Sequence, residues 1–234
     1  MTGIASFITV EGILPLEKSP LGALIAIRII FSIRLLVVSN LVVYNYAMDR
    51  DNVLNEAISF AAEAHKGARR KLDNSPYILH PMETCVIAGT MTSDVDILVA
   101  ALLHDTVEDA GITTETIKEK FGARVAELVG AETEIKSNGW KKRKEDSIAD
   151  LKKTTDLGVK IICLSDKLSN LRSFVRMWRV KGPKLWDALH QNDPAEQAWY
   201  YMSIADALRD MNDFEAYKEY KYLLKTIFTE YFNE

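Results

Sequence analysis

The residues best suited to chemistry in this sequence lie in the stretch LVAALLHDTVED, residues 98–109. Its apolar residues indicate a helix facing a core, yet they run directly into His104 and Asp105, followed by Glu108 and Asp109. Residues three or four apart are neighbours on a helix, so these side chains would line adjoining faces. Burying an imidazole and carboxylates beside leucines is unfavourable unless something such as a bound cation compensates. One nitrogen and one oxygen ligand suit a transition metal such as manganese, and also zinc or iron, better than calcium.

Two further ligand candidates come from distant parts of the chain. His80, in PYILHP, lies where a loop is expected to enter a helix, and Asp166, in CLSDKLSNLR, is an isolated acid within an apolar segment. Either one alone is typical of a hydrogen-bonded core residue. Together with His104 and Asp105 they predict a site of two nitrogen and two oxygen ligands, with positions open for water.

Four motifs in order carry a resemblance to a known family: HKGARRK, PYILHP, LLHDTVED and SDKLSNLR. In this order and spacing they resemble the hydrolase domain of RelA/SpoT-type proteins, and in particular the stand-alone small alarmone hydrolases among the HD metal-dependent phosphohydrolases. The resemblance covers Asp51 to Arg176. It implies an all-α fold, a manganese ion and removal of the 3′-pyrophosphate from guanosine tetra- or pentaphosphate. Two segments depart from the pattern, the loop from Lys71 to Pro76 and the segment GAETEIKS, and both fall at the expected substrate rim.

Carried over position by position, the resemblance implies three groups of site residues. The metal ligands would be His80, His104, Asp105 and Asp166. The catalytic residues would be Glu108 and Asp109, which handle the attacking water, and Asn170, an amide of the catalytic pocket. The substrate-binding residues would be Arg70, Lys71 and Ser173, and charge adds Arg172 as a further candidate opposite the acidic site.

Other cationic and aromatic residues have simpler interpretations. The run KKRK at 141–144 is expected to face solvent. Trp199, Tyr200 and Tyr201 could stack on a base, but core packing between the last two helices is the favoured interpretation.

Composition limits the classes of partner. The 234 residues, 48% of them apolar, are enough for one sizeable core, and the net charge of −4 disfavours a nucleic acid polymer as partner. A small phosphorylated nucleotide remains compatible with a few local cations. Cys85 and Cys163 lie far apart in apolar surroundings, which favours a reducing cytoplasm over a disulfide framework.

The elements that must position these residues are helical. The sequence predicts a helix ending near Gly67, one that runs towards Met91 with Pro81 in its first turn, one capped by Asp94, and two short helices separated at Gly122. The segment VKIICLSDKLSNLRSFVRMW is expected to be a central helix, although VKIICL alone could be a buried strand, and two helices follow Pro194 and Asp213. The predicted architecture is an all-α bundle of the HD-domain type.

The chain is expected to divide into a hydrophobic extension, residues 1–47, and a hydrolase domain, residues 48–234. Residues 21–46 are long enough to cross a bilayer as a helix, but Arg28 and Arg34 would each cost about 2.5–3.5 kcal/mol near its centre. A membrane anchor, an extra packing helix and an upstream extension outside the working protein all stay open. Membrane contact is therefore expected only if 21–46 acts as an anchor.

Three functions are compatible with this sequence. The first is a manganese-dependent pyrophosphohydrolase acting on guanosine tetra- or pentaphosphate. The second keeps the chemistry but takes NADPH or another nucleotide, since some stand-alone members of the family are similar to such phosphatases. The third is a catalytically idle nucleotide-binding regulatory module, which has no need of Glu108 and Asp109.

Overall fold

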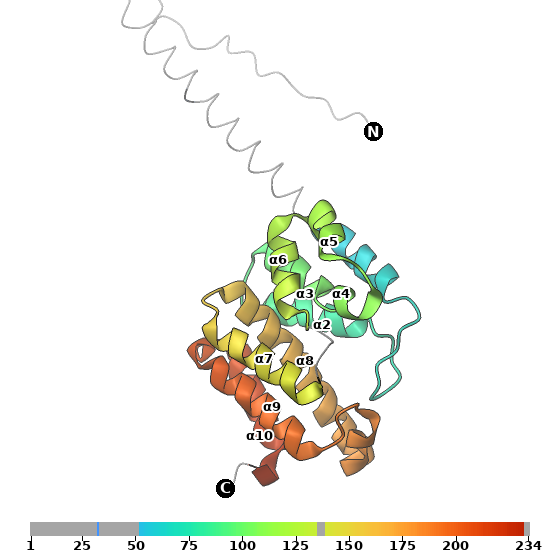
Figure 1. Cartoon of the computed structure of the whole chain (residues 1–234), viewed down its shortest axis with the longest axis vertical. Helices are drawn as coiled ribbons and strands as arrows, with labels where there is room; N and C mark the ends of the chain where they lie inside the picture. The colour runs from blue at the N-terminus through green and yellow to red at the C-terminus, as the bar shows by residue number, and fades with distance from the viewer. Residues whose placement is uncertain (1–31, 33–51, 135–138, 232–234) are drawn as a thin grey trace, which may run out of the picture. The chain divides into compact units, whose positions relative to one another are not determined.

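The computed structural model describes residue 32 and residues 52–134 and 139–231, and their regular structure is helical (Figure 1). Residues 52–64 are helical, and nine α-helices follow: α2 Leu79–Ala88, α3 Val95–Leu103, α4 Thr106–Ala110, α5 Thr114–Phe121, α6 Ala123–Glu132, α7 Trp140–Lys153, α8 Leu157–Lys181, α9 Pro194–Ala207 and α10 Glu215–Ile227. Short 3-10 helices at Gly182–Ala188, Arg209–Met211 and Thr229–Tyr231 complete the described part. Within these residues an isolated bridge between Arg69 and Pro76 is the sole β pairing, so the all-α prediction is confirmed.

Helix α8 is the central element of the bundle. It begins at an N-cap formed by Asp156, whose side chain accepts a hydrogen bond from the Gly158 backbone. It packs against α2, α3, α6 and α10, and its leucines Leu164, Leu168 and Leu171 are fully buried. The segment VKIICL lies within α8 and is helical, and its run of apolar residues reflects the burial of Ile161, Ile162, Cys163 and Leu164 in the core.

The helix expected to carry the His-Asp doublet is divided at the doublet. Asp94 caps α3 as predicted, but α3 ends at Leu103 and α4 begins at Thr106. The Thr106 hydroxyl donates a 2.7 Å hydrogen bond to the Leu103 carbonyl, so a side chain satisfies this carbonyl at the end of α3. Because the Asp109 amide still donates to the Asp105 carbonyl, Asp105 and Asp109 remain on one face.

Two other helix ends show how local sequence sets the bundle. Helix α2 starts at Leu79, which places Pro81 in its first turn as predicted, where a missing N–H leaves no intrahelical hydrogen bond unmade. Gly122 separates α5 from α6 as predicted, with φ of 94°, a conformation that a side chain disfavours.

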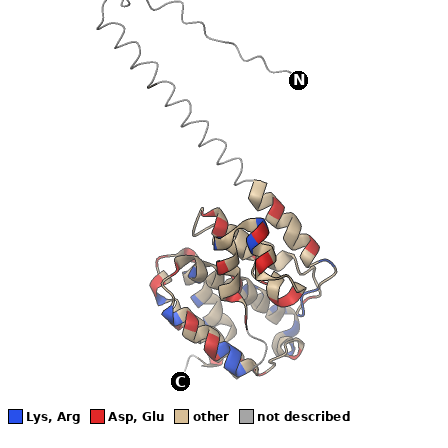
Figure 2. Ribbon diagram, turned by 45° about the horizontal axis from the view of Figure 1, so that its top comes forward, with Lys and Arg blue, Asp and Glu red and all other residues tan. Residues whose placement is uncertain are grey.

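Figure 2 shows acidic and basic residues side by side on the same helices.

The predictions for the N-terminal segment lie outside the described residues. This applies to the boundary between 47 and 48, and to the run 21–46 apart from residue 32. Among the helices that the structure describes, none combines the length and apolar character needed to cross a bilayer.

Candidate metal centre

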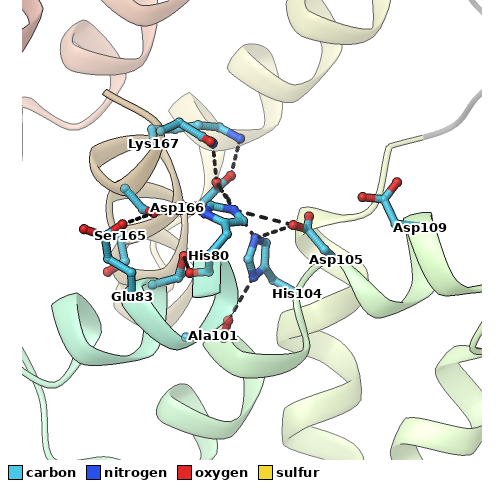
Figure 3. Close-up of polar contacts among 12 residues, drawn as sticks. His80, Glu83, Ala101, His104, Asp105, Asp109, Ser165, Asp166 and Lys167 are labelled. Atoms are coloured by element: carbon cyan, nitrogen blue, oxygen red, sulfur yellow. Dashed lines mark hydrogen bonds and ion pairs between the residues drawn. The ribbon is translucent and has the colours of Figure 1, made fainter. Parts of the chain in front are cut away.

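Four side chains from three parts of the bundle converge on one point (Figure 3). His80 comes from α2, His104 and Asp105 from the turn between α3 and α4, and Asp166 from the middle of α8. One ligand atom each of His80, His104 and Asp166 lies within 4.8 Å of the others, and all three residues are buried. His80 Nε2 is 3.1 Å from Asp166 Oδ1. Asp105 flanks this trio, with its Oδ2 3.1 Å from His104 Nε2 and 3.5 Å from His80 Nε2.

The environment of His104 shows that this cluster fits a cation. Its Nδ1 lies 2.9 Å from the Ala101 carbonyl, which can only accept, so Nδ1 carries the hydrogen. Its Nε2 is buried and has no hydrogen-bond partner among the described residues, although Asp105 Oδ2 lies 3.1 Å away. A buried nitrogen lone pair facing carboxylate oxygens is unfavourable unless a proton or a metal ion lies between them.

The electrostatics of the cluster are strongly coupled. Burial lowers the pKa of His104, but the carboxylates of Asp105 and Asp166 and the Ala101 carbonyl outweigh burial and raise that pKa to about 9. Burial dominates at His80 and lowers its pKa. The neighbouring cations hold the pKa of Asp166 well below its ordinary value despite burial, and Lys167 contributes most among them. Lys167 contacts the second oxygen of Asp166, so one side of this carboxylate already has a cationic partner.

Tyr77, which was not among the predicted site residues, contacts two of the predicted acids. Its hydroxyl donates to Asp105 Oδ2 at 2.7 Å and lies 3.1 Å from Asp109 Oδ2. A phenol has one hydrogen, so it serves one carboxylate at a time and favours the nearer one. The residue stands in the motif PYILHP three positions before His80, but a tyrosine there has no signal that separates it from a core aromatic.

Glu108 and Asp109 follow on α4, and both line the cavity described below. Burial, together with the negative charges of Glu134, Asp105 and Asp109, raises the pKa of Glu108. A carboxylate with a raised pKa is a stronger base than an exposed one, which suits the predicted handling of water.

Asn170 and Arg70 connect the cluster to the loop before α2. Asn170 Nδ2 donates to Asp166 Oδ1 at 2.7 Å, and its Oδ1 accepts from Arg70 Nη2 at 2.9 Å. The guanidinium of Arg70 also lies 5.8 Å from the centre of the Tyr77 ring. Arg70 and the neighbouring Lys71 both line the cavity, where the sequence analysis expected substrate-binding cations.

The other two predicted substrate-binding residues have different surroundings. Arg172 donates to both carboxylate oxygens of Glu219 on α10, at 2.7 and 2.6 Å, and to Glu83 on α2 at 3.3 Å. Ser173 accepts from Arg176 at 2.8 Å and from Arg70 at 3.4 Å. Neither is among the described residues that line the cavity. The Arg172 side chain therefore links α8 to α2 and α10 through its hydrogen bonds to these two carboxylates.

The cluster opens into a cavity of about 550 Å³. Its lining also includes the cations Arg143 and Lys144 from α7 and Lys167 from α8. The expectation that all of 141–144 faces solvent is therefore wrong for Arg143 and Lys144. Both turn inward to Glu134, at 3.2 and 2.5 Å, with side chains only 26% and 17% exposed. Tyr200 and Tyr201 are buried core residues, as expected, and they also line the cavity.

The helical fold and the buried His-Asp cluster define a class of protein, and residues 57–185 match the HD domain family. The chain belongs to this family, as the motifs predicted. Guanosine-3′,5′-bis(diphosphate) 3′-pyrophosphohydrolase MESH1 of Danio rerio is 39% identical over 164 residues, which cover 68% of this chain and 86% of the relative.

Other similar proteins include longer chains. A guanosine-3′,5′-bis(diphosphate) 3′-pyrophosphohydrolase of Aquifex aeolicus is 37% identical over 122 residues, which cover 51% of this chain and 17% of the relative. The matched part of this chain therefore spans about a sixth of that protein. A solved structure, described as a metazoan ortholog of SpoT that hydrolyzes ppGpp and plays a role in starvation responses, matches with a TM-score of 0.65 and 29% identity. The match covers 74% of this chain and 94% of the solved one.

Proposed function

We propose that this protein is a metal-dependent hydrolase that removes the 3′-pyrophosphate of guanosine tetra- or pentaphosphate. The observation that carries the proposal is the convergence of His80, His104, Asp105 and Asp166 at a cavity that is also lined by several cationic residues. This arrangement suits a polyphosphate placed against a cation. The activities for which the Danio rerio relative and the solved structure are named agree with it.

Mn²⁺ is the proposed cofactor, held by His80, His104, Asp105 and Asp166. Two imidazole nitrogens and two carboxylate oxygens form a mixed set that suits manganese and leaves room for water. The chemistry that a divalent cation supplies in such a site is activation of water, whose pKa falls from 15.7 to about 7 in favourable cases.

The residues of the chain divide the remaining work. Glu108 and Asp109 accept the proton of the attacking water, a role that contributes typically 10²–10⁴-fold to a rate. Tyr77 orients the Asp105 carboxylate through its hydroxyl, with Asp109 as the alternative acceptor. Arg70 and Lys71 bind the phosphorylated nucleotide and offset the repulsion between its phosphates and the acidic centre. Asn170 holds the Asp166 carboxylate in place and keeps Arg70 directed at the same site.

The test uses the full-length chain with Mn²⁺ and guanosine tetraphosphate, and resolves the products by anion-exchange chromatography. Guanosine diphosphate and pyrophosphate are expected in equal amounts, and Asp105→Asn should abolish both. If the metal-loaded protein shows no turnover, this substrate is rejected. A parallel panel that contains NADPH, scored for phosphate against pyrophosphate release, identifies a different nucleotide substrate.

A further inference from the structure

A short polar chain lies behind His80, on the side of the ring away from the metal centre. His80 Nδ1 is 2.9 Å from the Ser169 hydroxyl, and this hydroxyl donates to Glu83 Oε2 at 2.8 Å. Ser169 is fully buried and His80 is 4% exposed, while the side chain of Glu83 is 26% exposed. Figure 3 shows Glu83 and the His104–Asp105 pair on opposite sides of His80.

The hydrogens of this chain have a single consistent direction. A carboxylate only accepts, so the one hydrogen of the Ser169 hydroxyl is directed at Glu83. The Ser169 oxygen then offers His80 only lone pairs, and Nδ1 of His80 must carry the hydrogen between them. The opposite nitrogen, Nε2, is left with a lone pair directed at Asp166 and Asp105.

The position of Glu83 is itself held by cations. Its other oxygen, Oε1, accepts from Arg172 at 3.3 Å and lies 3.9 Å from Arg176. Arg172 is fixed in turn by its two bonds to Glu219. Each oxygen of Glu83 therefore has a different donor, and a neutral amide at this position could accept from only one of them.

From this geometry we infer that Glu83, acting through Ser169, is a positioning residue that fixes His80 as a metal ligand. Partners behind a metal-binding histidine fix its tautomer and orientation, and their loss typically lowers metal affinity 10- to 100-fold. In this chain a serine hydroxyl lies between the carboxylate and the imidazole. The inference also gives Arg172 a function, since it anchors Glu83.

The inference rests on the metal centre of the proposed function, but not on the identity of the substrate. Its test is the Mn²⁺ dissociation constant of the full-length protein, measured by calorimetry after chelation and dialysis. Ser169→Ala and Glu83→Gln should each weaken Mn²⁺ binding by about 10-fold or more. The double variant should bind about as weakly as Ser169→Ala alone, because both substitutions interrupt the same chain.

Ser165→Ala is the matched control. Ser165 is a buried serine one turn earlier on α8, and its hydroxyl donates only to the Ile161 carbonyl of its own helix, at 2.7 Å. This variant should keep wild-type Mn²⁺ affinity. Circular dichroism of each variant checks folding, and Glu83→Gln carries the test alone if Ser169→Ala does not fold.

Histidine side-chain NMR gives a second readout that a merely structural role would not move. Without metal, His80 should have its hydrogen on Nδ1 in the wild type and lose that preference in Ser169→Ala. Unchanged Mn²⁺ affinity in both folded variants, or a wild-type His80 with its hydrogen on Nε2, would overturn the inference. If Mn²⁺ affinity falls as expected while guanosine tetraphosphate is not hydrolysed, the positioning role stands and only the proposed substrate fails.

Discussion

Replacing Tyr77 with phenylalanine isolates the contribution of a single hydroxyl to the proposed reaction. The substitution keeps the ring, its contact with His65 at 4.9 Å and its place in the cavity wall. It removes the bond to Asp105 at 2.7 Å and the contact with Asp109 at 3.1 Å. A hydrogen bond to a charged group contributes about 1.5–3 kcal/mol, which corresponds to roughly a 10- to 150-fold loss if it acts in the transition state.

We expect kcat/KM for guanosine tetraphosphate to fall within this range in Tyr77→Phe, with most of the loss in kcat. Mn²⁺ affinity should change less, because Asp105 keeps its position beside both histidines. The matched control is Tyr217→Phe, which removes a 2.7 Å hydrogen bond to the Ala205 carbonyl between α9 and α10. This control should lose some stability but no activity. The reasoning is refuted if Tyr77→Phe keeps kcat/KM within twofold of wild type while folded and metal-loaded.

Three further outcomes can be measured directly. His80→Ala should abolish both Mn²⁺ binding and hydrolysis, since it removes a proposed ligand. If calorimetry shows that the variant still binds Mn²⁺, the assigned ligand set is wrong. Lys144→Met should raise KM for the nucleotide because Lys144 lines the cavity, whereas Lys142→Met should leave KM unchanged because Lys142 faces solvent. Equal KM values for the two variants would refute a role of Lys144 in binding the nucleotide. Leu168→Ala should lower the free energy of unfolding, measured by urea denaturation, by about 2–5 kcal/mol because Leu168 is fully buried. A loss well below this range would contradict the assigned burial.

The sequence predicted the metal centre better than the cavity around it. His80, His104 and Asp166 could be nominated because ionisable residues in apolar segments are costly without a shared partner, and the structure brings them together. The helical class followed from apolar spacing, and the ends at Asp94 and Gly122 from local capping chemistry.

The residues that sequence reasoning missed depend on tertiary contacts. Arg143 and Lys144 face inward because Glu134 lies within reach, and a basic run alone carries no information about that partner. Arg172 was predicted at the substrate from its charge alone, and the structure shows its donors bonded to carboxylates on α2 and α10, which the sequence could not indicate. Tyr77 shows the same limit, since its role depends on the positions of Asp105, in the turn before α4, and Asp109, on α4.

The origin of the four proposed ligands has a consequence for the stability of the whole bundle. They come from α2, from the turn between α3 and α4, and from α8, so one ion bound there would act as a crosslink between segments up to 86 positions apart. Ligand binding to the native state stabilises it by RT ln(1 + [L]/Kd), about 2.7 kcal/mol when the free ion is at 100 times its Kd. Metal supply would then set the resistance of the protein to unfolding and proteolysis, as well as its rate of turnover.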